Sequence, residues 1–465
     1  MAVSAPSRSI VTVNPATGDR LASYEPYSPA RLDAVLARAA AAFPAWRAFG
    51  FERRRAALER VGAHLRREKA AIAAIATREM GKPIAEAEAE VEKCAGACDY
   101  FAAHAGSFLA DERADSNAAR SYVAFRPLGV ILAIMPWNFP FWQVFRFAAP
   151  ALMAGNVGVL KHASNVTECA LEIERIFNAC ELPEGVFSTL VVDGSAMQDV
   201  VADPRVAAVS LTGSEGAGSA VAATAGKHLK KTVLELGGSD AFIVLADADL
   251  EAAAKVALRA RFQNTGQSCI AAKRFIVERP VYRAFIDAFV AQARSLRAGD
   301  PMDAQTQIGP LARADLRDAL ERQVDESLGA GAALELGGRR LERPGFFYAP
   351  TIVSGVTAAM PMFREETFGP AAAIVEAQDA EHALALANDS TYGLGGNLWT
   401  RDVARAEALA VRFASGGVFI NGMTASDPRL PFGGIKRSGH GRELSHYGIK
   451  EFVNIQTVWI GPAQG

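Results

Sequence analysis

Three segments of the sequence carry side chains that together are able to form and resolve a covalent bond to carbon. The first is Gly266-Gln267-Ser268-Cys269, where small and polar residues before a cysteine favour a tight turn with a reachable thiol. A single free cysteine is more often a small core residue, so this thiol alone does not establish a nucleophile. The other two segments supply the partners that a nucleophilic cysteine requires.

A carboxylate ends the apolar run Val233–Leu236 and stands directly before a Gly-Gly pair. This residue is Glu235. Burial at the end of a strand raises the pKa of a carboxyl group, which suits a general base. A glutamate that caps a neighbouring helix from the strand end explains the local sequence equally well, and both interpretations stay open.

An amide donor lies between two aromatic residues in Pro136-Trp137-Asn138-Phe139-Pro140. The prolines fix the backbone and remove two backbone donors. The Asn138 amide is then able to point into a pocket and stabilise an oxyanion, a contact whose loss typically costs about 3–4 kcal/mol of barrier. The alternative is an aromatic and proline turn that only packs.

The elements that must position these groups alternate along the chain. Before residue 110 the pattern is helical, with helices expected at Pro29–Ala48, Glu52–Arg78 and Ala85–Phe108. After residue 119 short apolar runs predict strands: Ser121–Phe125, Val130–Ile134, Val157–Leu160, Phe187–Val192, Ala207–Leu211, Val233–Leu236 and Ala241–Leu245. Strands that alternate with helices such as Thr167–Cys180 predict an α/β fold with a parallel, doubly wound sheet, whose ligands bind at the carboxyl ends of the strands.

The chain of 465 residues is too long for one core, so more than one domain is expected. A second α/β unit begins near residue 240, with Arg274–Glu278 strand-like and Val281–Leu296 helical. The tail Phe452–Ile460 alternates like an edge strand, which needs a partner. We expect it to pair with Ala119–Arg126 across a subunit interface.

Composition argues against several classes of protein. The formal net charge of -2 offers no excess of cations for a nucleic acid. No apolar stretch reaches about 18 residues without a charge, so no membrane span is expected. Residues 1–26 lack the pattern of a signal peptide.

The cysteines argue for a reducing compartment, and the cytoplasm is expected. Five in so long a chain is an odd, sparse set that does not suit a disulfide framework. Cys94 and Cys98 stand four apart in a helical stretch, but no second ligand pair lies nearby. Helix packing explains them better than a metal site, and no metal is expected.

Five segments occur in an order and at a spacing that resemble the aldehyde dehydrogenase superfamily over nearly the whole chain: Pro136–Pro140, Glu235–Gly238, Gly266–Cys269, Glu366–Pro370 and Pro431–Gly441. The resemblance implies a Rossmann-type cofactor domain (residues 1–118 and 127–237) and an α/β catalytic domain (238–440). It also implies a small β flap for oligomerisation (119–126 and 450–465) in a homodimer or homotetramer.

The resemblance also implies a mechanism. The Cys269 thiolate attacks an aldehyde carbon, and the Asn138 amide and the Cys269 backbone N–H hold the oxyanion. Hydride passes to a nicotinamide and leaves a thioester, which water activated by Glu235 hydrolyses. A glutamate at the base position favours hydrolysis over acyl transfer to coenzyme A.

The cofactor implied is NAD+ or NADP+. Gly213, Ser214 and Gly218 match a pyrophosphate turn at a helix N-terminus, where N–H groups and the helix dipole favour anions. Lys161 resembles the lysine that binds the adenosine ribose, and Ser164 stands where many NAD-specific relatives carry a glutamate, so a 2′-phosphate is not excluded.

The nicotinamide end is assigned in the same way. Glu366 resembles the carboxylate on the nicotinamide ribose and Phe368 the ring beside the nicotinamide, while Trp137 and Leu236 complete the cofactor site. Without the resemblance, the charged run Arg364–Glu366 would predict that Glu366 is a solvent-exposed surface residue.

Substrate choice depends most on Arg146, because succinate-semialdehyde dehydrogenases carry an arginine at this position. A guanidinium there is able to bind a distal carboxylate. The alternative is an arginine on the outer face of a helix. Phe139, Gln263 and Ser426 are the other expected substrate contacts, although some relatives have a second arginine in place of Gln263.

Three functions follow from these patterns. The first is oxidation of a small semialdehyde, most similar to bacterial NAD(P)-dependent succinate-semialdehyde dehydrogenases. The second is a broad aldehyde dehydrogenase in which Arg146 does not touch substrate. The third is a binding or structural protein without catalysis, which has no need of Cys269, Glu235 and Asn138 together.

Overall fold

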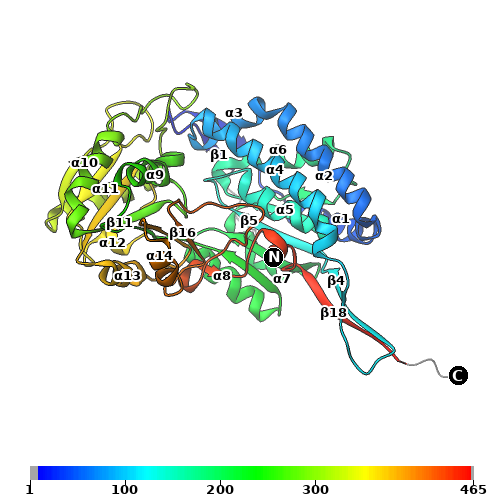
Figure 1. Cartoon of the computed structure of the whole chain (residues 1–465). Coiled ribbons are helices and arrows are strands. Elements are labelled where there is room, and N and C mark those ends of the chain that lie inside the picture. The colour runs from blue at the N-terminus through cyan, green and yellow to red at the C-terminus, as the bar shows by residue number, and fades with distance from the viewer. Residues whose placement is uncertain (1–8, 462–465) are drawn as a thin grey trace.

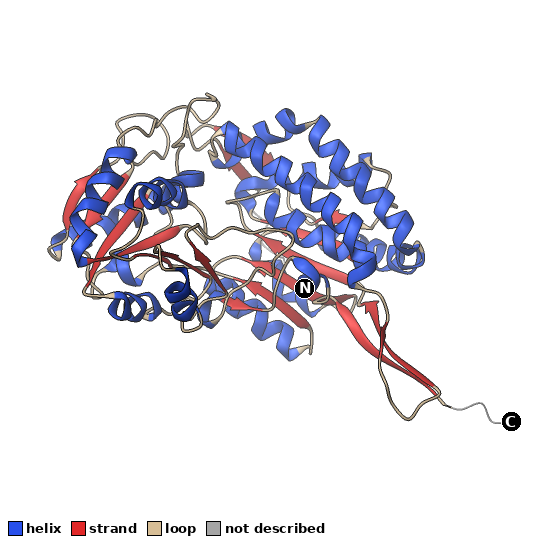
Figure 2. Cartoon of the chain, viewed as in Figure 1, coloured by secondary structure: helices blue, strands red, loops and turns tan. Residues whose placement is uncertain are grey.

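The computed structural model describes residues 9–461, arranged as two α/β bodies and a projecting arm (Figure 1). Helices lie against the sheets of both bodies (Figure 2). The α/β class that the alternating pattern predicts is confirmed.

The first body is built on a six-stranded sheet in the order β17-β9-β8-β5-β6-β7. All neighbours in it are parallel except β17 and β9. The central strand β5 is an apolar run buried along nearly its whole length, as expected of a parallel sheet covered on both faces. Its strands are β5 (Val130–Met135), β6 (Val157–His162), β7 (Phe187–Thr189), β8 (Val206–Thr212), β9 (Lys231–Glu235) and β17 (Gly439–His440).

The helices of this body include the four that begin the chain. They are α1 (Pro29–Ala48), α2 (Gly50–Arg67), α3 (Lys69–Met80), α4 (Ile84–Phe108), α5 (Trp142–Ala154), α6 (Thr167–Ala179), α7 (Met197–Ala202), α8 (Glu215–Lys227) and α15 (Ser445–Ile449). The expected single helix Glu52–Arg78 is two helices, because Glu68 leaves the helical conformation. The break lets α2 pack on α4 while α3 turns to pack on both α4 and α6.

The second body is built on a seven-stranded sheet in the order β12-β13-β14-β11-β10-β15-β16, parallel except between β12 and β13. Its strands are β10 (Asp240–Val244), β11 (Ala272–Glu278), β12 (Ala333–Leu336), β13 (Thr351–Ser354), β14 (Ala371–Ala377), β15 (Gly395–Trp399) and β16 (Gly417–Ile420). Its helices are α9 (Leu250–Phe262), α10 (Tyr282–Ala293), α11 (Ala314–Gly329), α12 (Pro361–Arg364), α13 (Ala380–Asn388) and α14 (Val403–Ala410). Separate apolar cores fill its two faces.

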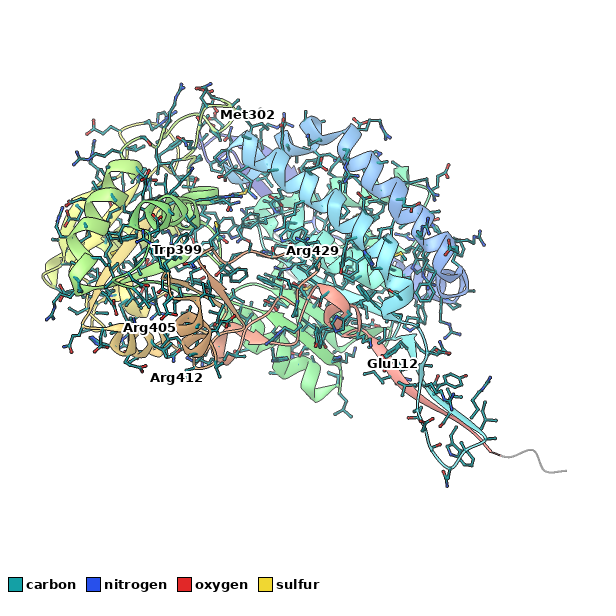
Figure 3. The ribbon with its side chains drawn as sticks, viewed as in Figure 1. Glu112, Met302, Trp399, Arg405, Arg412 and Arg429 are labelled. Carbon is teal, nitrogen blue, oxygen red and sulfur yellow. The ribbon has the colours of Figure 1, made fainter. Side chains whose placement is uncertain are left out.

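The arm is a three-stranded antiparallel sheet that leaves the first body (Figure 1). It consists of β3 (Glu112–Arg113), β4 (Arg120–Pro127) and β18 (Val453–Ile460). The expectation that the tail pairs with residues 119–126 of another subunit is wrong, because β18 pairs with β4 of its own chain along all eight residues. Glu112, at the base of the arm, accepts a bond from Lys450 at 2.8 Å (Figure 3).

Two smaller features complete the fold. A hairpin of β1 (Ile10–Val13) and β2 (Arg20–Tyr24) precedes α1. Cys94 and Cys98 are buried in the core face of α4. Within residues 9–461, no helix is both long and apolar enough to cross a membrane.

Candidate active site

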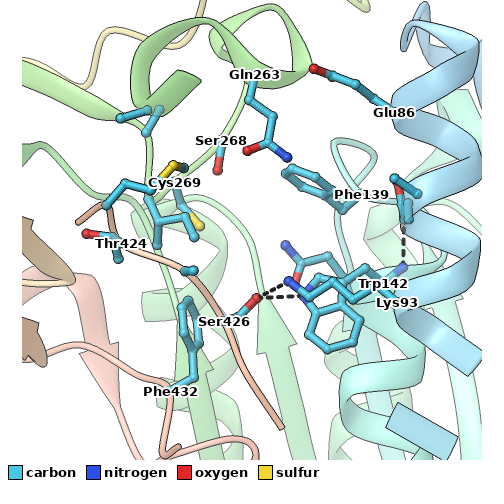
Figure 4. A pocket seen from close by; sticks show the side chains of 18 of the residues that line it. Glu86, Lys93, Phe139, Trp142, Gln263, Ser268, Cys269, Thr424, Ser426 and Phe432 are labelled. Atoms are coloured by element: carbon cyan, nitrogen blue, oxygen red, sulfur yellow. Dashed lines mark hydrogen bonds between the residues drawn. The ribbon is translucent and has the colours of Figure 1, made fainter. Parts of the chain in front are cut away.

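A cavity of about 390 Å³ is lined by both bodies. Helices α4 and α5 of the first body line one side, and the end of α9, the turn before Cys269 and the loop Met423–Phe432 line the other (Figure 4). This volume suits a small organic molecule.

Cys269 reaches this cavity from a strained turn. Asn264, Thr265 and Gly266 have φ values of 56°, 55° and 73°, and a left-handed β-branched threonine costs energy that its surroundings must supply. The Thr265 hydroxyl accepts from the Gly309 N–H at 2.9 Å, and the Asn264 amide donates to the carbonyls of Asn138 and Gln267. The turn is therefore fixed by its own side chains.

Two buried cations hold the backbone around the thiol. The Lys273 ammonium donates to the carbonyls of Ser268 at 2.9 Å and of Cys269 at 2.8 Å. The Arg261 guanidinium donates to the carbonyls of Gly266 at 2.7 Å and of Gly369 at 2.5 Å. Burial raises the pKa of the Cys269 thiol to about 12, although Arg146 and Lys273 oppose this shift. The proton must therefore be removed before the sulfur attacks.

Glu235 ends β9 with 2% of its surface exposed. Burial raises its carboxyl pKa well above the ordinary value, with a further contribution from Glu443, while Arg146 opposes. Among residues 9–461, neither of its carboxylate oxygens has a hydrogen-bond partner, so the helix-capping interpretation is not supported. Such a carboxyl group binds a proton more readily than an ordinary glutamate, which suits a general base.

The structure brings these two residues and Asn138 to one place. The Asn138 amide donates to the Gln267 carbonyl at 3.1 Å, which ties Pro136–Pro140 to the turn before the thiol. Gly238, three residues after Glu235, lies so close that an added Cβ would stand 2.6 Å from the Cys269 carbonyl oxygen. The Glu235 charge in turn contributes to the raised pKa of the thiol. Nucleophile, carboxylate and amide donor are thus neighbours.

The N-terminus of α8 lies next to them. Ser214 caps this helix and accepts from the Ala217 N–H at 3.4 Å. An added Cβ at Gly218 would stand 2.5 Å from Leu236, so glycine allows Leu236 to pack against the first turn. The Gly213 N–H donates to the Glu235 carbonyl at 3.0 Å, which joins this turn to β9. Free N–H groups at such a terminus favour phosphate.

Lys161 lies near the end of β6, a strand of the same sheet, and Ser164 follows this strand. Lys161 is half-buried, and burial lowers the pKa of its ammonium. Ser164 begins the 3-10 turn Ser164–Val166. A helix N-terminus together with an ammonium group suits the phosphates of a dinucleotide.

Glu366 lies against the Gly237-Gly238 turn and is not a solvated surface group. It accepts from the Gly238 N–H at 2.9 Å, lies 3.7 Å from the Lys273 ammonium, and burial raises its carboxyl pKa. The rings of Phe368 and Trp137 meet edge to face with centroids 5.7 Å apart. A carboxylate beside an aromatic pair is able to hold a ribose and an adjoining flat ring, so the residues present fit a nicotinamide dinucleotide.

Arg146 lies inside the molecule and not on an outer helix face. It is 2% exposed, lines the cavity and pairs with Glu443. Its guanidinium also donates to Thr212 at 3.2 Å and lies 4.6 Å from the centre of the Phe432 ring. The charge of Arg146 is therefore largely compensated within the protein.

The other expected substrate contacts also line the cavity. Phe139 and Gln263 reach it from the two bodies (Figure 4). Ser426 accepts from the Lys93 ammonium at 2.6 Å and from the Trp142 indole N–H at 3.1 Å.

Comparison with known proteins identifies the family. The model of the aldehyde dehydrogenase family matches residues 2–458. The chain belongs to the aldehyde dehydrogenase family. A succinate-semialdehyde dehydrogenase (NADP+) of Mycolicibacterium paratuberculosis is 51% identical to this aldehyde dehydrogenase over 459 residues, 98% of this chain and 97% of the relative. One of Mycobacterium tuberculosis is 50% identical, over 97% and 99% of the two chains.

Solved structures agree with these sequence relatives. Succinic semialdehyde dehydrogenase from Streptococcus pyogenes, solved in complex with NADP+, has a TM-score of 0.95 and 40% identity, with 97% of this chain and 100% of that chain covered. The protein Gox0499 has a TM-score of 0.96 and 42% identity, over 98% and 100%.

Sequence reasoning missed three charged residues of this aldehyde dehydrogenase site. Lys93 lay in a stretch assigned only to helix packing, although a lysine on the core side of an apolar helix was a usable signal. Glu443 lies just beyond the segment Pro431–Gly441, and Lys273 follows Cys269 by four residues outside every motif used. Their partners, Ser426, Arg146 and the Cys269 loop, are distant in sequence or bonded through backbone carbonyls.

Proposed function

We propose that this aldehyde dehydrogenase oxidises succinate semialdehyde to succinate with NADP+ or NAD+. The observation that carries the proposal is the cavity itself, in which a thiol faces a group of cationic and hydroxyl side chains. A substrate with an aldehyde at one end and a carboxylate at the other matches both ends. The names of the relatives at 50–51% identity over nearly the full length support the same substrate and NADP+.

In the proposed mechanism, the Cys269 sulfur attacks the aldehyde carbon after losing its proton. The Asn138 amide, which now donates to the Gln267 carbonyl, swings to the developing oxyanion together with the Cys269 backbone N–H. A nicotinamide cofactor, held by Glu366, Phe368, Trp137 and Leu236, would supply the hydride acceptor. Glu235 then removes a proton from water, for which its raised pKa suits it, and the water releases the acid from sulfur.

We infer that the α8 N-terminus and Lys161 hold the cofactor phosphates, and that Glu366, Phe368, Trp137 and Leu236 hold the nicotinamide end. Ser164 supports acceptance of NADP+, because its small neutral side chain does not repel a 2′-phosphate and Lys161 stands three residues away. The cofactor domain would then be residues 1–118 with 127–237, and the catalytic domain residues 238–440.

A homodimer or homotetramer is part of the proposal. Three large apolar side chains of β18 are exposed, Ile455, Trp459 and Ile460, at 62%, 53% and 38%. Apolar groups on a projecting strand favour a protein partner. Light scattering of the purified protein would test this, and a monomer would contradict it. Five free cysteines support a cytoplasmic location.

A broad aldehyde dehydrogenase is the second candidate, and the Arg146–Glu443 pair favours it because a compensated guanidinium binds a carboxylate less well. The deciding experiment follows reduced-cofactor formation with succinate semialdehyde and with a neutral four-carbon aldehyde, each with NAD+ and NADP+. A strong preference for the semialdehyde is expected. Equal rates on both aldehydes would favour the second candidate.

A further inference from the structure

A partly buried cation of the substrate cavity, Lys93, has no carboxylate partner among the described residues. Lys93 extends from α4, and its ammonium lies 4.1 Å from the centre of the Trp142 ring. Among residues 9–461, no Asp or Glu oxygen lies within 4.0 Å of it. A partly buried ammonium in this position is costly unless an anion arrives.

The hydrogen bonds around Lys93 leave donors unused. The Ser426 hydroxyl oxygen accepts from Lys93 at 2.6 Å and from the Trp142 indole at 3.1 Å, so both of its lone pairs are engaged. Its own O–H is left to donate to a third group. The ammonium has three N–H bonds and donates one of them to Ser426. Two kinds of donor therefore remain at one end of the cavity, away from Cys269 (Figure 4).

Three of the neighbouring charged residues, Arg146, Glu90 and Asp427, are already paired. Arg146 pairs with Glu443. Glu90, on the same helix as Lys93, pairs with Lys82 and accepts from two backbone N–H groups at the N-terminus of α5. Asp427, beyond Ser426, pairs with Arg429. Arg259 also lines the cavity but is exposed.

We propose that Lys93, together with the Ser426 hydroxyl, is the main binding site for the distal carboxylate of the substrate, ahead of Arg146. This assignment rests on the proposed function. The carboxylate would accept one N–H from Lys93 and the O–H of Ser426, while Trp142 fixes both donors. The specificity of the enzyme for a semialdehyde of this length would then be set by the distance between α4 and the thiol.

Electrostatics support this assignment. Burial, and the positive charge of Arg146, lower the pKa of the Lys93 ammonium to about 8, while Glu90 and Asp427 oppose this. The ammonium is still mostly protonated at neutral pH. A carboxylate ligand would stabilise that charge in place of the water that burial removes.

The test compares kcat and KM of three variants on succinate semialdehyde and on a neutral four-carbon aldehyde. Lys93→Met keeps the length of the side chain and removes its charge. Its kcat/KM ratio of semialdehyde to neutral aldehyde should fall about 10- to 100-fold, mainly through KM, because charge-assisted hydrogen bonds are lost. Lys93→Arg should restore part of the ratio. Arg259→Met removes an exposed charge from the same cavity and should change the ratio less than about threefold.

The outcomes separate this inference from the proposed function. Failure of the wild-type protein to oxidise succinate semialdehyde would defeat the proposed function itself. If the wild type oxidises it and Lys93→Met lowers kcat/KM equally for both aldehydes, the Lys93 assignment is wrong. Inhibition by succinate gives a second readout on the same proteins, and an unchanged inhibition constant in Lys93→Met and Lys93→Arg would also overturn it.

Discussion

Removal of the Arg146 charge should destabilise the protein more than it would if this arginine only contacted substrate. Arg146 and Glu443 are 2% and 4% exposed, and each is the other's buried counter-charge. In Arg146→Met, the Glu443 carboxylate keeps only the 3.4 Å hydrogen bond that the Ser210 hydroxyl donates. It also lies close enough to the Glu235 carboxyl group for the two charges to repel each other. Breaking one side of a buried pair typically costs about 3–5 kcal/mol.

This loss converts into a measurable shift of the melting temperature. The unfolding entropy of about 2.1 cal/mol/K per residue gives roughly 1 kcal/mol/K for a chain of this length, so Tm should fall by about 3–5 °C. Glu443→Gln alone should lower the free energy of unfolding by less. The double variant Arg146→Met/Glu443→Gln should be about 2–3 kcal/mol more stable than the sum of the two single losses predicts. Differential scanning fluorimetry of the four proteins is sufficient.

The effect should also depend on pH. Burial already raises the pKa of Glu443, and loss of Arg146 raises it further. A carboxyl group whose folded pKa is raised holds its proton more tightly in the folded state, so stability is lost as pH rises through that pKa. The Tm deficit of Arg146→Met should therefore be larger at about pH 8 than at about pH 5.5. A pH-independent deficit, or a double variant no better than the sum of the single ones, would refute the pairing argument.

Three further predictions concern the catalytic and cofactor residues. Cys269→Ala should abolish turnover and keep cofactor binding, measured by fluorescence titration of the reduced cofactor; residual turnover would contradict the role of the thiol. Asn138→Ala should lower kcat about 10²–10³-fold, through loss of an oxyanion donor, in steady-state assays; an unchanged kcat would exclude that role. Ser164→Glu should reduce kcat/KM for NADP+ about tenfold or more relative to NAD+, because a carboxylate would repel the 2′-phosphate. An unchanged ratio would place the 2′-phosphate elsewhere.

The alternation of apolar runs and helical stretches predicted the parallel sheets well. Buried strands such as β5 and β8 read directly as apolar runs, because both faces are covered. The break at Glu68 was missed, because Arg67 and Glu68 are both good helix formers and the local sequence does not mark the end of α2.

Part of the candidate site could also be predicted from the sequence. Cys269, Glu235 and Asn138 stand in motifs with turn-forming glycines or prolines, and the structure brings them together. The partner of Arg146 was not predictable, because Glu443 lies 297 positions away and meets it only after β17 joins the sheet. The partner of Lys93 was not predictable for the same reason, since Ser426 lies 333 positions further along the chain.

The Arg261 guanidinium has a mechanical consequence. It holds the Gly266 carbonyl before the thiol and the Gly369 and Thr367 carbonyls after Glu366, while it also reaches Ala272 on β11 at 3.1 Å. The loop that carries the nucleophile and the loop that carries Glu366 are thereby clamped to one strand and shift as a single piece. On the proposed assignment of Glu366 to the cofactor ribose, Glu366 could not withdraw alone without also displacing the sulfur. Cofactor release and the position of the nucleophile would then depend on the same buried side chain.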